Sequence, residues 1–126
     1  TPPSDADRAR QRAVVDAFLA AARGGDFEAL LALLDPDVVL RSDEAAAKVG
    51  SPAELRGAPA VAATFAGRAK AAQPALIDGA VGLAWAPGGE PKVAFALTIA
   101  WGTITAIEVL ADPETLLEAG VTILGD

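Results

Sequence analysis

Acid–base chemistry in this sequence must use Asp, Glu, Lys or water, because it contains no His, Cys or Tyr, and the carboxylates supply the candidate sites. Asp43 ends the apolar stretch DVVLRSD, and Arg41 lies on the same face if that stretch is a strand. A carboxylate at the mouth of an apolar cavity has a raised pKa and can take a proton from carbon near neutral pH. The same Asp could instead cap the following loop, and Arg41 could lower its pKa or hold an anionic ligand.

Asp78, in LIDGAV, is a second candidate catalytic residue because its neighbours are apolar. Asp followed by Gly is also a common turn pair, so a structural role is the alternative. Glu108 is expected on a solvated sheet face, and Asp112 is expected to cap a helix. No carboxylate pair has a metal-ligand spacing with His or Cys, so we expect neither a metal nor a cofactor.

Trp101, in TIAWGTITAI, stands where turn chemistry favours Asp or Asn before Gly102. The ring could cover the open end of a cavity and stack on a planar ligand. It could instead anchor a contact with another protein, or be a lone exposed ring. The sequence leaves these three alternatives open.

The composition limits the classes of partner. A chain of 126 residues predicts one domain. Its net charge of −7, without a basic cluster, argues against direct contact with nucleic acid or an anionic membrane. It has no apolar run of the roughly 18 residues that a membrane span needs, and TPPSDADRARQR is not a signal peptide. We expect a cytoplasmic protein, and the start at Thr1 without Met indicates a cut-out or processed chain.

The apolar spacing predicts helices before strands. Residues 1–6 are expected to be a disordered tail, and residues 7–126 a single domain. Helices are predicted over 7–23, 27–34, 58–72 and 113–120. Strands are predicted over 37–43, 75–78, 80–86, 92–100 and 103–111, and residues 44–57 are predicted to form a loop with room for a helical turn. This order is typical of an α+β fold with helices on one face of a curved antiparallel sheet.

The last hairpin is predicted to turn through the three residues 100–102. Its inner face would then carry Val93, Phe95, Leu97, Ile99, Ile107 and Val109. Its other face would carry Ala94, Ala96, Thr98, Ile104, Ala106 and Glu108. The second face is flat and made mostly of small residues, which suits partial exposure or a homodimer contact.

Several segments in order carry a resemblance to a known family: RQRAVVDAFLAAARGGDFEALLALLDPDVVLRSD, ELRGAPAVAATFAGRA, and the stretch from PALIDGAVGLAW to ADPETL. Over roughly residues 8–118 the chain resembles SnoaL-like domains, most closely the C-terminal domain of extracytoplasmic-function RNA polymerase sigma factors. The resemblance implies a cone-shaped, cystatin-like α+β barrel, shared with nuclear transport factor two and ketosteroid isomerase, with an apolar pocket. It also implies the sigma factor core regions as partners in a full-length parent. SDEAAA at 42–47 departs from the family, which often has glycines there.

The pocket of such a fold would be lined by Phe18, Val39, Arg41, Phe65, Trp85, Phe95, Leu97, Trp101 and Ile107, although core packing explains each apolar residue equally well. Relatives tend to carry Gly or Asp at 101, a larger residue at 84 and often Phe at 97. Ala84, Leu97 and Trp101 therefore indicate either a pocket reshaped for a ligand or natural drift.

Three hypotheses for the function follow. The first is a regulatory or small-molecule-binding domain, derived from a sigma factor, whose ligand is small, planar and apolar. The second is an enzyme, natural or engineered on this scaffold, in which Asp43 abstracts a proton inside an apolar pocket. The third is a module that forms a homodimer through the small-residue sheet face.

Overall fold

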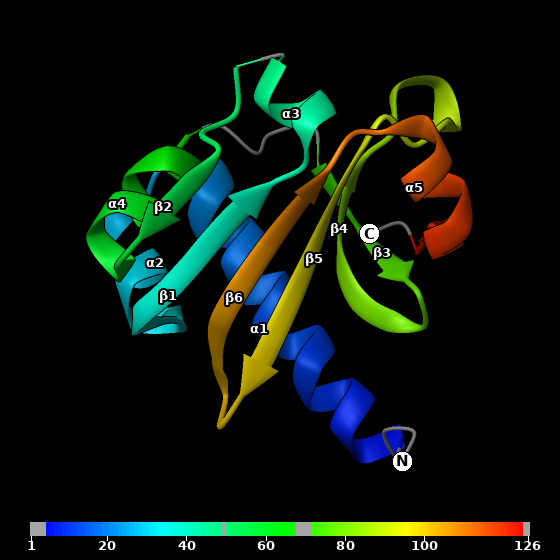
Figure 1. Ribbon diagram of the computed structural model, residues 1–126. Coiled ribbons are helices and arrows are strands. Elements are labelled where there is room, and N and C mark those ends of the chain that lie inside the picture. Colours follow the sequence, from blue (N-terminus) through cyan, green and yellow to red (C-terminus); the bar gives the residue numbers. More distant parts are fainter. Residues whose placement is uncertain (1–4, 49, 68–71, 125–126) are drawn as a thin grey trace.

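A curved sheet of seven strands carries helices on both of its faces (Figure 1). The structure, a computed structural model, describes residues 5–48, 50–67 and 72–124, with side chains from Ala9 onward. The helices are α1 (Asp5–Gly24), α2 (Phe27–Leu33), α3 (Glu44–Lys48), α4 (Ala58–Phe65), the short 3₁₀ turn η1 (Pro87–Gly89) and α5 (Pro113–Ala119). The strands are β1 (Leu34–Ser42), β2 (Glu54–Arg56), β3 (Ala72–Ile77), β4 (Ala80–Trp85), β5 (Val93–Ala100), β6 (Thr103–Leu110) and β7 (Thr122–Ile123).

The strands run in the order β2-β1-β6-β5-β4-β3-β7, which confirms the predicted α+β class with a curved sheet. The sheet is mixed, however, because β1 pairs with β6 in parallel while the other neighbours are antiparallel. It also stays open, with β2 and β7 at its edges. Local patterns predict hairpins between consecutive strands, but they carry no information about the direction of a pair so far apart in sequence.

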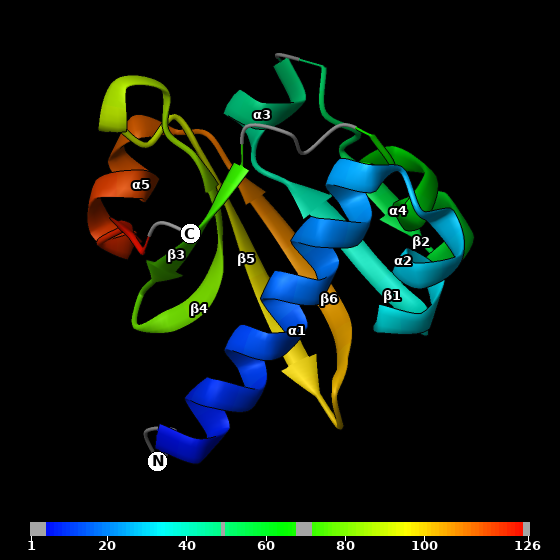
Figure 2. The same cartoon turned by 180° about the vertical axis from the view of Figure 1, so that it is seen from behind.

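Helix α1 crosses the inner face of the sheet and supplies much of the core (Figure 2). It begins at Asp5, two residues earlier than predicted and inside the expected tail. Its end is as predicted: the N–H of Gly25 bonds the carbonyl of Ala22 at 3.2 Å, and that of Asp26 bonds Ala21 at 2.9 Å. The carboxylate of Asp26 then caps α2 by accepting the N–H of Ala29 at 3.1 Å.

Helix α4 is shorter than predicted. It ends at Phe65, and Ala72, the last residue of the predicted helix, opens β3 instead. The N–H of Gly67 bonds the carbonyl of Ala22 on α1 at 2.7 Å, so a tertiary contact overrides the helix propensity of the alanines. Residues 68–71 of the predicted helix lie outside the described residues. The predicted loop 44–57 holds α3 and the edge strand β2.

The hairpin between β5 and β6 turns through two residues, Trp101 and Gly102, rather than three. Their φ angles of 56° and 78° are those of a type I′ turn, in which both central residues are left-handed. Glycine takes such a φ freely, whereas a bulky residue does so rarely. The pairing shifts between Thr98 and Ile99, which leaves Thr105 as an extra residue. Ile104 therefore lies fully buried in the core instead of on the outer face.

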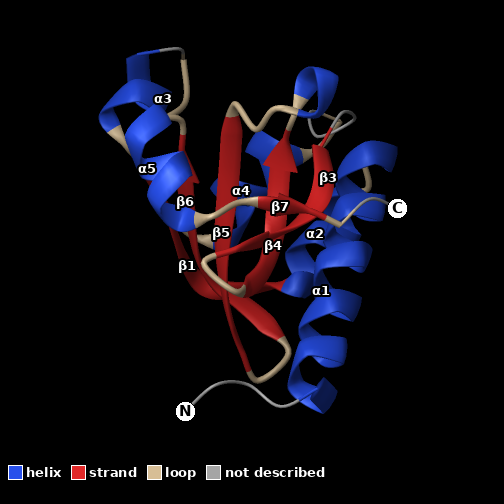
Figure 3. Cartoon of the chain, turned by 90° about the vertical axis from the view of Figure 1, so that its right-hand side faces the viewer, coloured by secondary structure: helices blue, strands red, loops and turns tan. Residues whose placement is uncertain are grey.

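Helix α5 lies on the outer face of the sheet, on the side away from α1 (Figure 3), so the prediction that the helices lie on one face was wrong. Leu116 of α5 packs against Ile77 and Ala94, with Ala96 and Leu110 half-buried beside them. The helix thus covers the small-residue face only at Ala94, near the start of β5. Ala96 and Ala106 are half-buried, and Thr98 and Glu108 are exposed. Within the described ranges, no helix is long and apolar enough to cross a membrane.

Candidate functional site

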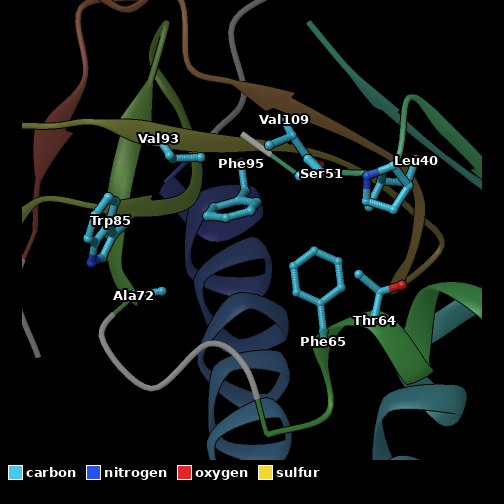
Figure 4. Close-up of a pocket in the computed structure, with 11 residues that line it drawn as sticks. Leu40, Ser51, Thr64, Phe65, Ala72, Trp85, Val93, Phe95 and Val109 are labelled. Atoms are coloured by element: carbon cyan, nitrogen blue, oxygen red, sulfur yellow. The ribbon is translucent and has the colours of Figure 1, made fainter. Parts of the chain in front are cut away.

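An apolar cavity of about 340 Å³ opens where β4 ends, β5 begins and β1 leads into α3 (Figure 4). This volume lies at the lower end of the range for small-molecule sites. The described lining residues are Leu40, Gly50, Ser51, Pro52, Thr64, Phe65, Ala72, Trp85, Val93, Phe95 and Val109. The cavity therefore draws on β1, the segment that follows α3, α4, and the strands β3 to β6.

Aromatic rings form the cavity wall. The ring of Phe65 contacts that of Phe95 edge to face at 5.8 Å between centroids, and Figure 4 shows the two rings next to each other in the cavity wall. The buried ring of Phe18 on α1 also contacts that of Phe65 edge to face, at 5.1 Å between centroids. Trp85 pairs across the sheet with Ala72 and Val93, so all three point to the inner face. Because Trp85 ends its strand at the open side, it remains 43% exposed.

Small side chains leave the space that these rings surround. Ala72 presents only a methyl group to the cavity, and Gly50 presents no side chain. The start of β3 is held against α1 because the guanidinium of Arg23 donates a hydrogen bond to the carbonyl of Ala72. This bond fixes the start of β3, which forms one side of the cavity, relative to α1.

The polar groups of the described wall are few. Thr64 turns its hydroxyl to the carbonyl of Ala60 on its own helix, at 3.0 Å. Ser51 Oγ lies 2.7 Å from Ser42 Oγ, and Ser42 Oγ donates to the carbonyl of Pro52 at 2.7 Å. None of the described lining residues carries a charge. This wall suits an uncharged, apolar molecule, because a charged one would lose hydration without gaining a partner.

Asp43, the first candidate base, lies between the end of β1 and the segment that leads into α5. One carboxylate oxygen accepts the N–H of Ala46 at 2.8 Å, and the other accepts those of Ala111 at 2.9 Å and Asp112 at 3.0 Å. Desolvation acts to raise the pKa of Asp43, but these backbone donors outweigh it and hold the pKa below its ordinary value. The direction is opposite to what a base near neutral pH requires. The geometry gives Asp43 the role of an ionised anchor that caps α3 and joins it to β6 and α5.

The other two charged candidates also lie away from the cavity. Asp78 is exposed and forms, with Gly79, the tight turn between β3 and β4; its N–H bonds the carbonyl of Ala119 at 2.6 Å. Arg41 is exposed, with Nε 3.1 Å from Oε1 of Glu54, and this bond is the main cause of a lowered pKa of Glu54. The described residues hold no group of three or more His, Cys, Asp or Glu side chains that could bind a metal.

Of the residues predicted to line a pocket, the structure brings three to the cavity: Phe65, Trp85 and Phe95. Phe18, Leu97 and Ile107 are buried in the core beside or beneath it. Val39 and Arg41 belong to a shallow groove with Glu108, on the opposite face of β1 from Leu40, which does line the cavity. The stretch DVVL has three apolar residues in a row, so alternation alone could not settle which of them point inward.

Trp101 is fully exposed at the hairpin tip, at the other end of β5 and β6 from the cavity. Five residues of β5, 96–100, separate Trp101 from Phe95 in the cavity wall, which is about 20 Å of strand. Ala84 is buried next to Ala94 in the sheet, and Leu97 lies in the core. Positions 84, 97 and 101 therefore do not surround a common cavity.

Sequence reasoning did not name the other eight described lining residues as pocket residues, although it placed Val93 and Val109 on the inner face of the hairpin. The eight are Leu40, Gly50, Ser51, Pro52, Thr64, Ala72, Val93 and Val109. Leu40 shares a face of the strand with Val38, but three apolar residues in a row give no signal for which face points inward. Ala72 was missed because it was assigned to a helix. Neither Ser51 nor Thr64 carries a recognisable signal, since their position depends on how α4 and the segment after α3 pack against the sheet.

Solved structures of several other proteins are similar to this fold. The extracytoplasmic function sigma factor SigJ of Mycobacterium tuberculosis is similar at 24% identity and a TM-score of 0.67, over 87% of this chain and 45% of that chain. An LEH-like epoxide hydrolase of M. tuberculosis is similar at 18% identity and a TM-score of 0.53, over 89% and 90% of the two chains. An NTF2-like protein of Burkholderia xenovorans LB400 is similar at 20% identity and a TM-score of 0.57, over 89% and 96%.

No protein-family model and no curated protein matches the sequence. The chain spans less than half of the sigma factor that it resembles. At these identities the likeness shows the fold alone, and the fold expected from the resemblance to SnoaL-like domains is confirmed.

Proposed function

We propose that this chain, which has an NTF2-like fold, is a small-molecule-binding domain whose ligand is planar, apolar and uncharged. The observation that carries the proposal is the open cavity walled by Phe65, Phe95 and Trp85. Flat rings bind flat molecules well, because edge-to-face and stacked contacts add about 0.5–1.5 kcal/mol to the gain from burial. For a two-ring ligand we expect a Kd on the order of 100 µM, about −5.5 kcal/mol.

A neutral fluorescent probe tests this proposal. N-phenyl-1-naphthylamine should bind the parent chain with saturable enhancement of its emission. Ala72→Leu adds three carbons inside the cavity and should weaken binding at least tenfold. Ala63→Leu is the matched control, because Ala63 lies on the exposed side of α4 and outside the cavity wall. Equal binding by the two variants would place the probe elsewhere and contradict the proposal.

A regulatory role within a longer protein is a second candidate, favoured by the likeness to the sigma factor SigJ. In that case the partner would be the sigma factor core regions, and the cavity would be where a small molecule biases the contact. Titrating this chain against the isolated core regions of that sigma factor, with and without the probe, tests the idea. Absence of binding under both conditions would argue against it.

The enzyme hypothesis has less support. Among the described residues no carboxylate lines the cavity, and both oxygens of Asp43 accept backbone hydrogen bonds. The hypothesis of a homodimer through the small-residue face is narrowed, because α5 packs on Ala94 and leaves only the part around Thr98, Ala106 and Glu108 open to a second chain. The proposal therefore rests on binding rather than on catalysis or assembly.

A further inference from the structure

The hydroxyl groups near the cavity form a chain with a fixed direction. A serine hydroxyl has one hydrogen to donate. Ser42 gives its hydrogen to the carbonyl of Pro52 at 2.7 Å. The 2.7 Å contact between Ser42 Oγ and Ser51 Oγ must then be donated by Ser51. Ser51, which lines the cavity, therefore has no hydrogen left to donate, and its lone pairs are its remaining capacity.

Thr64 carries the second hydroxyl in the described wall, and this hydroxyl also has no hydrogen left to donate. It donates its hydrogen to the carbonyl of Ala60 at 3.0 Å. The indole N–H of Trp85 is a further donor in the wall. Its side chain is 43% exposed, so water can accept this hydrogen bond. The hydroxyls of this wall can thus accept a hydrogen bond from a ligand but cannot donate one.

The chain of hydroxyls also strengthens the acceptor. Donating to Ser42 leaves the Ser51 oxygen richer in electron density, and hydrogen bonds in series polarise one another. A ligand hydroxyl or N–H that reaches Ser51 Oγ therefore gains a good acceptor in a largely apolar setting. A ligand carbonyl next to Ser51 Oγ would face the lone pairs of that oxygen. It would lose its hydrogen bonds to water and gain none from the protein.

We propose that the cavity selects aromatic hydrogen-bond donors, of the phenol, arylamine or indole class, through the acceptor oxygen of Ser51. This inference rests on the proposed function, because it names the ligand class of the same cavity. The aromatic body lies against Phe65 and Phe95, and the donor group points to Ser51. The cavity binds aromatic ketones of similar size with lower affinity than these donors.

Titration calorimetry with four naphthalenes of similar shape tests the selection: naphthalene, 2-naphthol, 2-methoxynaphthalene and 2-acetylnaphthalene. In the parent chain 2-naphthol should bind about three- to tenfold more tightly than its methyl ether, as expected for one net hydrogen bond. The ketone should bind no more tightly than the ether. Equal affinities for naphthol, ether and ketone would overturn the inference.

Two serine variants locate the effect. Ser51→Ala removes the acceptor and should erase the preference for naphthol, while the affinity for naphthalene stays within about twofold. Ser42→Ala leaves Ser51 with a free hydrogen, so the ketone should gain about threefold and approach the affinity of naphthol. A preference for naphthol that persists in Ser51→Ala would overturn the inference. An unchanged preference against the ketone in a folded Ser42→Ala would contradict the direction of the hydroxyl chain.

The two proposals fail in different ways. If naphthalene and all three derivatives fail to bind the parent chain, the proposed function is wrong. If all four bind with one affinity and Ala72→Leu weakens them all, the cavity is a binding site but the role of Ser51 is wrong. Circular dichroism of each variant confirms that a lost preference is not a lost fold.

Discussion

The turn at Trp101 and Gly102 stores conformational strain that one substitution should release. Trp101 adopts φ 56° at the first central position of a type I′ turn, where Asn and Asp are favoured. Its ring is fully exposed, so the described structure provides no packing that offsets the strain. We therefore expect Trp101→Asn to stabilise the protein.

The size of the effect follows from the backbone. A left-handed conformation costs a residue with a β-carbon roughly 1–2 kcal/mol, and Asn tolerates it better because its side chain bonds the local backbone. We expect a gain of about 1 kcal/mol, since no buried contact of the ring is lost. For a chain of 126 residues this corresponds to a rise in Tm of about 3–5 °C.

Urea unfolding followed by circular dichroism measures this gain. The midpoint should rise by about 0.5 M with an unchanged m-value. Trp101→Ala is the control, because it removes the ring but keeps a β-carbon in the strained turn, and it should stay within about 0.5 kcal/mol of the parent. If both variants unfold more easily than the parent, the ring makes stabilising contacts and the reasoning is refuted.

Three further substitutions test other parts of the structure. Gly82→Ala should cost about 1–3 kcal/mol in urea unfolding, because its β-carbon would lie 2.5 Å from the carbonyl oxygen of Phe95; Gly24→Ala, with nothing within 4 Å, should have little effect. Asp43→Asn should cost about 1–2 kcal/mol at neutral pH, because an amide cannot match the ionised cap, while leaving probe binding within about twofold. The folded-state pKa of Asp43 is lowered, so its contribution is full above the ordinary pKa of 3.8 and is lost as the pH falls through the folded-state pKa. The difference between parent and Asp43→Asn in unfolding free energy should therefore shrink on acidification, and a constant difference would contradict this role. Asp112→Ala should cost about 1 kcal/mol by removing the cap that accepts the N–H of Thr115 at 3.0 Å, and an unchanged Tm would show that the cap is dispensable.

The sequence predicts those elements whose signals are local. The end of α1 at Gly24, the cap of α2 by Asp26 and the cap of α5 by Asp112 all follow from residue types at fixed offsets. The alternation of β5 places Phe95 and Leu97 inward, as observed. The order of helices before strands predicted the curved sheet, and the family resemblance implied the same fold.

What the sequence could not give depends on contacts between distant elements. The parallel pairing of β1 with β6, the early end of α4 and the bulge at Thr105 are each decided by tertiary packing. The candidate site shows the same division. Phe65, Trp85 and Phe95 could be predicted as cavity residues, but the hydroxyl chain from Ser51 through Ser42 could not, because its members come from different segments.

The location of a bound aromatic molecule is the measurement that tests the central claim most directly. Methyl resonances followed by NMR during titration with 2-naphthol report it residue by residue. The account predicts that the methyl groups of Ala72, Val93 and Val109 shift together and saturate, while that of Val39 on the opposite sheet face does not move. Shifts confined to Val39 and the outer face, or the absence of any saturable shift, would contradict it.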